Sequence, residues 1–197
     1  MLEAAYAVLA LRRADLHTAA AVHIRKALEF AVVAQWIHVT PKGLDAFIDE
    51  SRHNVDKLVA EAITANVLVP AQVAASLARD AAVAPDQAKV MSQFKRVADS
   101  FGVGSGIYMM YRSLSSQCHP NVGAVVQHLE EAPESTGGVA ICLHGGVPNS
   151  AHYFTLAASL LWVARPVDSR TKFQPRKADL QSISKRLGVP SQLKPLQ

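Results

Sequence analysis

Apolar residues return every three or four positions along most of the chain, which is the spacing of amphipathic helices. Residues 2–39 follow this pattern without Gly or Pro and end at Pro41. They predict either one very long helix or two helices with a bend near His17. A second amphipathic helix is predicted from Gly43 to just before Pro70. Its apolar positions, expected to face inward, are Phe47, Val55, Leu58, Val59 and Ile63.

Prolines and glycines place the next boundaries. Pro70 suits the first turn of a short third helix, and Pro85 suits the start of a fourth helix that runs to about Phe101, because proline lacks only an amide that is unpaired there. Residues 102–106 have glycine at every second position, which indicates a turn. Their spacing matches neither a P-loop nor a dinucleotide fingerprint.

A fifth helix is predicted after this turn. Ser105 is expected to cap it, and it should run to His119, because the residue before Pro120 is pushed out of helical geometry. Beyond it, residues 121–131 predict a shorter helix and residues 139–143 a short extended piece.

The last third of the chain predicts two more helices. Asn149 or Ser150 can cap a sixth helix that runs to about Ala164, and its nearly unbroken apolar run suggests a buried position. A last helix is predicted over residues 176–187. The pattern as a whole predicts an all-α protein, a helical bundle followed by a basic C-terminal helical tail.

Composition refines this fold class. Half of the 197 residues are hydrophobic, mostly Ala and Val, which suits closely packed helices. Aromatic residues make up only 6%, which argues against a broad stacking platform for single-stranded nucleic acid.

Charge divides the chain into two parts. Residues 165–197 contain eight Lys or Arg and two Asp, a net charge of +6, whereas the remainder carries −2. We therefore predict a bundle over residues 1–164 and a basic tail over residues 165–197. Such a tail either binds an anionic surface or is a solvated end.

Cysteine usage and hydropathy indicate the compartment. Two cysteines, Cys118 and Cys142, are too few for a disulfide framework, and no signal-peptide pattern opens the chain. The most apolar stretches are shorter than the roughly 20 residues that cross a bilayer. We expect a cytoplasmic protein with no membrane partner. The spacing of the histidines does not match structural zinc sites, so we expect no metal and no other cofactor.

The fifth helix carries the candidate chemistry. At about 100° per residue, one face is apolar and is predicted to be core. This face consists of Ile107, Met110, Tyr111, Leu114 and Cys118. An adjacent stripe, here called the α-helical stripe, holds a phenol, a cation, a hydroxyl and an imidazole. Its members are Tyr108, Arg112, Ser115 and His119.

Arg112 and His119 are suited to chemistry at a phosphodiester. They lie seven residues apart, which is two helical turns or roughly 10 Å. An Arg guanidinium holds phosphate oxygens, and a His that titrates near neutrality can remove a 2′-hydroxyl proton or donate one to the leaving oxygen. Such a site needs no metal.

These residues carry a family resemblance. The Arg-x6-His spacing before a helix end resembles the motif of the HEPN superfamily of all-helical domains. Residues 111–120, Tyr-Arg-Ser-Leu-Ser-Ser-Gln-Cys-His-Pro, are similar to the Tyr-Arg-x-x-Ser-x-x-x-His-Pro signature of a bacterial branch related to abortive-infection proteins. Residues 25–29, with Arg25 and Glu29, resemble that branch's first-helix segment. The resemblance covers roughly residues 20–165.

The resemblance implies a function. In HEPN ribonucleases, the Arg and His of two protomers meet across a dimer interface and form a metal-independent endoribonuclease site, often within a toxin–antitoxin pair. It therefore implies a homodimer, an RNA substrate, a protein antitoxin, and Arg112 and His119 as catalytic residues. Tyr108 and Ser115 are supporting residues by geometry, and Arg25 and Glu29 by the second motif. The chain departs from the common pattern at Ser113, where active members have Asn, Asp or His.

A structural interpretation of the same residues stays open. Arg112 could instead pair with Glu29, and His119 could hydrogen bond a carbonyl in the last helical turn. Arg25 and Glu29, one turn apart, could form a pair within their helix or reach the fifth helix. The alternative function is then a noncatalytic interaction or ligand-binding module.

DNA is not an expected partner. Residues 179–192 resemble the first helix and turn of a helix-turn-helix, but only residues 191–197 remain for the helix that would read the major groove.

Overall fold

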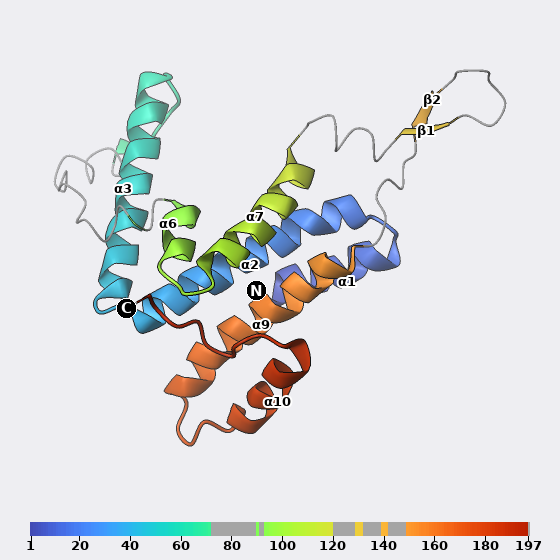
Figure 1. Cartoon of the computed structure of the whole chain (residues 1–197). Coiled ribbons are helices and arrows are strands. Elements are labelled where there is room, and N and C mark those ends of the chain that lie inside the picture. Colours follow the sequence, from blue (N-terminus) through green and yellow to red (C-terminus); the bar gives the residue numbers. More distant parts are fainter. Residues whose placement is uncertain (72–89, 91–92, 120–128, 132–138, 142–148, 197) are drawn as a thin grey trace.

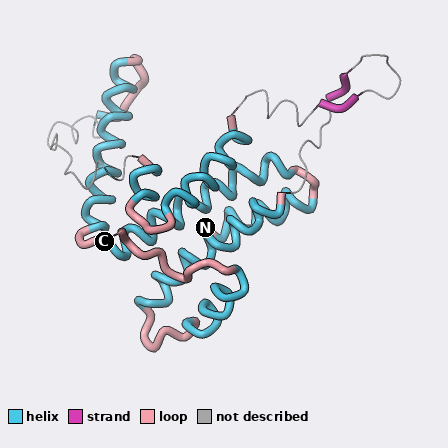
Figure 2. The backbone as a smooth tube through the Cα atoms, viewed as in Figure 1, coloured by secondary structure: helices cyan, strands magenta, loops and turns pink. Residues whose placement is uncertain are grey.

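The part of the chain that the structure describes is predominantly helical, which confirms the predicted all-α class (Figures 1 and 2). The structure is a computed structural model, and it describes residues 1–71, 90, 93–119, 129–131, 139–141 and 149–196. The described helices are α1 (Leu2–Arg13), α2 (His17–Val39), α3 (Gly43–Thr64), α6 (Phe94–Asp99), α7 (Gly104–Cys118), α9 (Ser150–Arg170) and α10 (Lys177–Leu187).

A short antiparallel hairpin interrupts the helices. Strand β1 (Leu129–Glu131) pairs with β2 (Val139–Ile141), with Leu129 opposite Ile141. The predicted helix over residues 121–131 is therefore wrong at its end, where cross-strand pairing replaces it, and residues 121–128 lie outside the described residues. The predicted extended piece over 139–143 is confirmed for residues 139–141.

Residues 2–39 form two helices, α1 and α2, and not one long helix, which is the second of the two alternatives that the sequence left open. Asp15 separates α1 from α2 and has a φ of 56°, in the left-handed region that Asp tolerates better than most residues. The amide of Leu16 donates to the carbonyl of Leu11, which turns the chain back. Helix α2 ends at Val39, two residues before Pro41, as expected.

Helix α2 is the centre of the bundle. It packs against α1, α7 and α9, as Figure 1 shows. Its buried surface is rich in alanine, whose small side chain lets neighbouring helices approach closely. The buried residues of α2 are Ala20, Ala21, Ile24, Ala27, Leu28, Ala31, Val32, Gln35 and Trp36.

Helix α9 runs further than its sequence predicts. Asn149 caps it as expected, with its side-chain oxygen 2.9 Å from the amide of Ala151. The predicted end near Ala164 is wrong, because α9 continues through Pro166 to Arg170. The predicted boundary between bundle and tail, after residue 164, thus falls inside this helix.

Gln35 compensates for this internal proline. Pro166 has no amide hydrogen to donate to the carbonyl of Trp162, four residues earlier. The fully buried side chain of Gln35 donates to that carbonyl instead, at 2.6 Å. The carbonyl oxygen of the same amide accepts from the backbone of Leu193, at 3.0 Å. One side chain therefore joins α2, α9 and the C-terminal segment.

Residues 189–196 return along the bundle. The indole of Trp162 donates to the carbonyl of Pro190 at 2.8 Å, and the amide of Gly102 donates to the carbonyl of Lys194 at 3.1 Å. The side chain of Leu193 is fully buried. The C-terminal segment thus contributes Leu193 to the hydrophobic core.

Helix α3 departs most from its predicted orientation. The residues that it buries are Gly43, Ala46 and Glu50. Phe47, Val55, Leu58 and Ile63, predicted to face inward, are exposed, and Val59 is half-buried. Within the described chain, α3 packs on the end of α2 through its first turns, so most of its apolar face has no described helix to cover it.

Two predicted features around α6 and α7 also differ. The fourth helix does not run unbroken to Phe101, since Gln93 is extended (φ −134°, ψ 114°) and α6 starts after it. Ser105 does not cap α7, which begins one residue earlier. Gly104 is required there by close packing, because a Cβ would lie 2.2 Å from the carbonyl oxygen of Ala98. Most of the predicted third helix and the start of the fourth lie outside the described residues.

We expect Gln35→Leu to destabilise the protein by about 2–5 kcal/mol, because it leaves the Trp162 carbonyl and the Leu193 amide buried without partners. Urea denaturation followed by circular dichroism measures this free energy. In a Pro166→Ala background the cost should be smaller, since that substitution restores a backbone amide donor for the Trp162 carbonyl.

The matched control is Gln181→Leu, the same change at an exposed position of α10, which should alter stability by less than about 0.5 kcal/mol. Equal costs for Gln35→Leu with and without Pro166 would show that the glutamine does not substitute for the missing helical bond.

Candidate functional site

Helix α7 is fixed to the bundle by one apolar face. Ile107 and Leu114 are almost fully buried, which confirms their assignment to the core. Met110, Tyr111 and Cys118, assigned to the same face, are half-buried and lie at its edges. Because α7 packs on α2 along this face, Arg112 and His119 of the adjacent stripe are left exposed, whereas Tyr108 packs against the edge of the core.

A cluster of partly buried residues joins α2 to α7. Arg25 Nε lies 3.1 Å from a carboxylate oxygen of Glu29, and its Nη2 donates to the hydroxyl of Tyr111 at 2.9 Å. The guanidinium carbon also lies 4.8 Å from the centre of the Tyr111 ring. Two alternatives were stated for Arg25 and Glu29, a pair within their own helix and a contact with the fifth helix. Both are present, because Arg25 pairs with Glu29 and also contacts Tyr111 of α7.

Electrostatics keep Arg25 charged. Partial burial disfavours the cation, but the Glu29 carboxylate and the Tyr111 hydroxyl outweigh it and raise the pKa of Arg25 above its ordinary value. A guanidinium with two such partners is held in one orientation. Arg25 is thus a structural cation that fixes α7 on α2.

Aromatic contacts extend the cluster to α6. The rings of Phe94 and Tyr111 have centroids 4.4 Å apart, and those of Tyr108 and Tyr111 lie 6.0 Å apart. The ammonium of Lys95 lies 5.6 Å from the centre of the Tyr108 ring. Tyr108, the first member of the stripe, is therefore half-buried between α6 and the rest of α7.

The remaining members of the stripe face outward. Arg112 is exposed, and within the described residues it forms no hydrogen bond or ion pair. Ser115 is half-buried one turn further on. His119 is exposed at the helix end, where its backbone is extended (φ −106°, ψ 140°). The predicted end of this helix before Pro120 is confirmed.

The structure does not contain the alternative pair between Arg112 and Glu29. The described partner of Glu29 is Arg25, on the same helix. Since Arg112 follows Tyr111 directly, it projects from α7 in a different direction from the residue that contacts Arg25. The structural interpretation of Arg112, which depended on a pair with Glu29, is therefore not supported.

Cys118, next to His119, is a packing residue. Its thiol donates to the carbonyl of Leu114 at 3.1 Å, and burial raises the pKa of the thiol above its ordinary value. A protonated thiol is a weak nucleophile. The candidate chemistry on this helix thus rests on Arg112 and His119.

The C-terminal end of α7 also contacts the first turn of α9. The side-chain amide nitrogens of Gln117 and Asn149 each lie 3.4 Å from Nε2 of His152. Burial lowers the pKa of His152 below its ordinary value, which favours the neutral imidazole. This neutral histidine helps to position the helix end that carries His119.

Sequence reasoning missed the polar roles of Tyr111, Lys95 and His152. Tyr111 was assigned to the apolar face by periodicity alone, although a buried phenol usually finds a hydrogen-bond partner. That rule, applied with the arginine in the first-helix segment, could have found the Arg25 contact. Nothing in the sequence pattern pairs His152 with Gln117.

The described cavity lies elsewhere. A space of about 410 Å³ separates the C-terminal part of α9 from α10. Its lining residues are Ala164, Val167, Asp168, Thr171, Pro175, Arg176, Asp179, Leu180 and Ile183. None of them belongs to the α-helical stripe.

Neither a metal centre nor a membrane span appears among the described residues. No three His, Cys, Asp or Glu side chains gather there in a way that could hold a metal ion. No described helix combines the length and the apolar character needed to cross a bilayer. His144 and Cys142 lie outside the described residues.

Comparisons with known proteins add no relative. No family model, curated protein or solved structure matches the chain. The functional argument therefore rests on the residues themselves and on the short motifs that they form.

We expect Tyr111→Phe to lower the free energy of unfolding by about 1 kcal/mol, because it removes the hydroxyl that accepts from Arg25 and keeps the ring. Chemical denaturation measures the change. Tyr6→Phe, at a position that is 71% exposed, serves as the control and should have no effect. Equal stability of both variants would mean that the Arg25 hydrogen bond does not hold α7.

We also expect His152 to make stability depend on pH. Its folded pKa lies below the ordinary value of about 6.5, so the folded state resists the proton that the unfolded chain accepts. Its contribution is present above that value and is lost as the pH falls. Denaturation at pH 7.5 and pH 5.0 should show a smaller loss for His152→Asn than for wild type.

His53→Asn, an exposed change on α3, is the control and should lose as much stability as wild type. An unaltered pH dependence in His152→Asn would remove His152 as the cause.

Proposed function

We propose that the protein is a HEPN-like, metal-independent endoribonuclease in which Arg112 holds phosphate and His119 acts as general acid or base. One observation carries this proposal. Arg112 and His119 are both exposed, two turns apart along one helix, while the adjacent face of that helix is held in the core. A cation and an imidazole presented together on a rigid support can meet a phosphodiester.

The chemistry needs only groups that the chain and the RNA provide. A neutral imidazole removes the proton of a ribose 2′-hydroxyl, and the resulting oxygen attacks the adjacent phosphorus. The bond to the 5′-oxygen breaks, and an imidazolium donates a proton to that leaving oxygen. The products are a 2′,3′-cyclic phosphate and a 5′-hydroxyl. The Arg112 guanidinium stabilises the negative charge on the phosphate oxygens.

A homodimer supplies what one chain lacks. The reaction uses a base and an acid on opposite sides of the phosphorus, whereas one chain presents a single histidine on this stripe. Two copies that pair along α7 would provide two Arg112 and two His119 side chains at one interface. The supporting roles of Tyr108 and Ser115, and of Arg25 and Glu29 beneath them, are to fix the orientation of this helix. From the resemblance alone, we propose a protein antitoxin as a further partner.

A second candidate is a noncatalytic interaction module built on the same surface. It is favoured by Ser113, which stands where active members of the resembled family have Asn, Asp or His. In this case the exposed Arg112 would contribute to binding, and no bond would be broken.

The decisive assay is cleavage of a labelled single-stranded RNA by the purified chain in the presence of EDTA. We expect His119→Ala to slow cleavage by at least about 100-fold, the usual contribution of general acid–base catalysis. Arg112→Ala should also slow it strongly, because the charge on the phosphate is no longer neutralised.

Matched controls are His53→Ala on α3 and Arg13→Ala on α1, both exposed and away from α7, which should cleave at the wild-type rate. Cleavage that persists in His119→Ala would assign the activity to another site or to a contaminant. RNA binding without cleavage in wild type would favour the noncatalytic candidate.

A further inference from the structure

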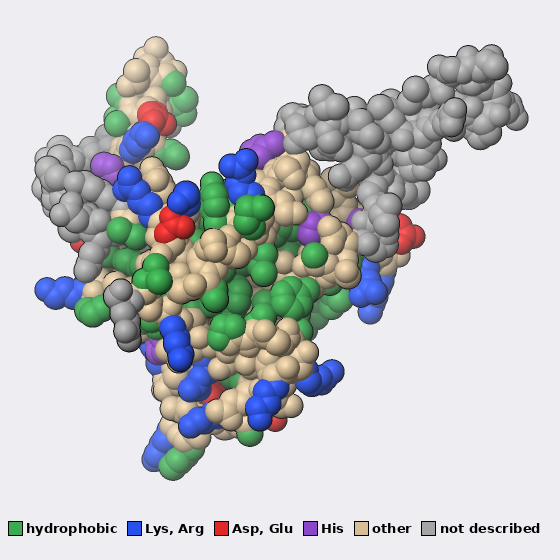
Figure 3. Space-filling view, in the orientation of Figure 1, with side chains coloured by type: hydrophobic (Ala, Val, Ile, Leu, Met, Phe, Trp, Pro, Cys, Tyr) green, Lys and Arg blue, Asp and Glu red, His purple; other side chains and the backbone are tan. Residues whose placement is uncertain are grey.

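The connection between α9 and α10 is the most basic exposed loop that the structure describes. Residues 170–177, Arg-Thr-Lys-Phe-Gln-Pro-Arg-Lys, contain four cations and no carboxylate. Figure 3 shows Lys and Arg side chains around this end of the molecule. At its tip, Phe173 is 88% exposed. An exposed aromatic ring among cations is the arrangement with which proteins bind single-stranded nucleic acid.

The backbone at the tip is strained. Phe173 has a φ of 68° and Gln174 a φ of 45°, both in the left-handed region that bulky side chains avoid. Two consecutive residues in this region persist only where the surrounding structure imposes them. The backbone thus adopts an unfavourable conformation that exposes an apolar ring to solvent. Packing of the ring does not explain this conformation.

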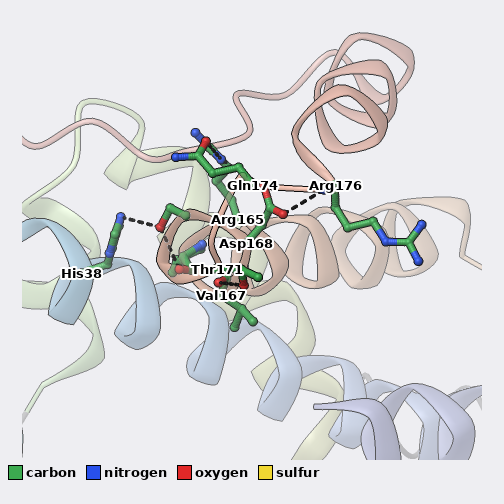
Figure 4. Close-up of polar contacts among 9 residues, drawn as sticks. His38, Arg165, Val167, Asp168, Thr171, Gln174 and Arg176 are labelled. Atoms are coloured by element: carbon green, nitrogen blue, oxygen red, sulfur yellow. Dashed lines mark hydrogen bonds and ion pairs between the residues drawn. The ribbon is translucent and has the colours of Figure 1, made fainter.

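A buried carboxylate imposes this geometry, as Figure 4 shows. Asp168, only 5% exposed, accepts from the backbone amide of Arg176 at 2.9 Å. The guanidinium of Arg165 lies 3.4 Å from both the Asp168 carboxylate and the side-chain oxygen of Gln174. The backbone amide of Gln174 donates to the backbone carbonyl of Thr171. The loop is therefore preorganised on both sides of Phe173.

The surroundings of the ring leave room for a base. The ammonium of Lys172 lies 5.1 Å from the ring centre, a cation–π contact that accounts for one neighbour of the phenyl group. With 88% of the residue exposed, ring surface remains open to solvent. Arg170, Lys172 and Lys177 are exposed within a few residues of it and can contact phosphates.

We propose that the α9–α10 loop binds single-stranded RNA, with one base stacked on Phe173 and the flanking phosphates held by Arg170, Lys172, Arg176 and Lys177. The low aromatic content excludes a broad stacking platform, but one ring is enough for one base. This inference rests on the proposed action on RNA and assigns a second contact to the same substrate.

The loop and the α-helical stripe lie at opposite ends of α9. The first turn of α9 contacts the end of α7 through His152 and Gln117, and the loop follows its last residue, Arg170. At 1.5 Å per residue the two ends are roughly 30 Å apart. Figure 1 shows the end of α7 and the α9–α10 connection toward opposite ends of α9. The loop would hold a strand at a distance from the site of cleavage.

The test is the affinity of the full chain for a fluorescein-labelled, 2′-O-methylated 15-nucleotide RNA, measured by fluorescence anisotropy. This probe lacks the 2′-hydroxyl nucleophile and stays intact. We expect Phe173→Ala to weaken binding at least about fivefold, the lower bound for the loss of one stacked base. Phe173→Trp should bind as wild type does.

Phe30→Ala provides the matched control. Phe30 is 51% exposed on α2 and has the ammonium of Lys26 6.0 Å from its ring centre, so it reproduces an exposed phenyl group with a lysine neighbour outside the loop. Its removal should leave affinity unchanged. Equal affinity of Phe173→Ala and wild type, or equal losses in Phe173→Ala and Phe30→Ala, would overturn the proposal.

Phe173→Leu separates base stacking from insertion into a membrane. Leucine keeps the apolar side chain but has no ring, so it should bind RNA as weakly as Phe173→Ala. Wild-type affinity in Phe173→Leu would overturn stacking. Stacking would also be overturned if Phe173→Ala bound vesicles containing phosphatidylserine more weakly than wild type but bound the RNA with wild-type affinity.

Salt dependence tests the phosphate contacts. The double variant Lys172→Gln, Lys177→Gln should reduce the slope of log affinity against log salt by about 1.4, because each phosphate contact on a single strand contributes about 0.7. An unchanged slope would remove these lysines from the site.

This inference and the proposed function can fail separately. Binding that depends on Phe173 without cleavage would contradict the ribonuclease and leave the loop site standing. Cleavage that needs His119, together with RNA affinity that does not change on removal of Phe173, would support the ribonuclease and contradict the loop site.

Discussion

The contact between Gln35 and the carbonyl of Trp162 is the constraint on which the arrangement of the bundle depends. Pro166 removes a helical hydrogen bond from a buried part of α9. An orphaned carbonyl there would favour a break in the helix. Because Gln35 donates to it and also accepts from Leu193, α9 continues and the C-terminal segment is held against α2. That continuation determines what α9 can carry, since the turns after Ala164 contain Asp168, the buried carboxylate that organises the basic loop.

The sequence predicted those features that local chemistry determines. The end of α7 before Pro120 was predicted outright, and the break between α1 and α2 and the cap at Asn149 were each one of two stated alternatives; all three depend on one or two adjacent residues. The end of α9 could not be predicted, because the partner that rescues it lies 127 residues away. The predicted orientation of α3 was wrong for a related reason. Periodicity identifies an apolar face of a helix but does not show whether a neighbouring element covers it.

The candidate site shows the same division. Helical periodicity was sufficient to place Arg112 and His119 on one side of α7, because both positions belong to a single regular element. It could not distinguish the two arginines near this helix. Arg25 is engaged by Glu29 and Tyr111, whereas Arg112 projects into solvent. That difference arises from how α7 sits on α2.

The two arginines also explain why the helix can present reactive groups at all. An exposed cation contributes little to stability, and a helix whose only polar contacts were exposed would be weakly held. Here the partly buried Arg25 holds the middle of α7 and His152 contacts its C-terminal end, so the outward face does not have to stabilise the fold. Residues on that face can then serve a ligand, and a substitution there should alter function before it alters stability.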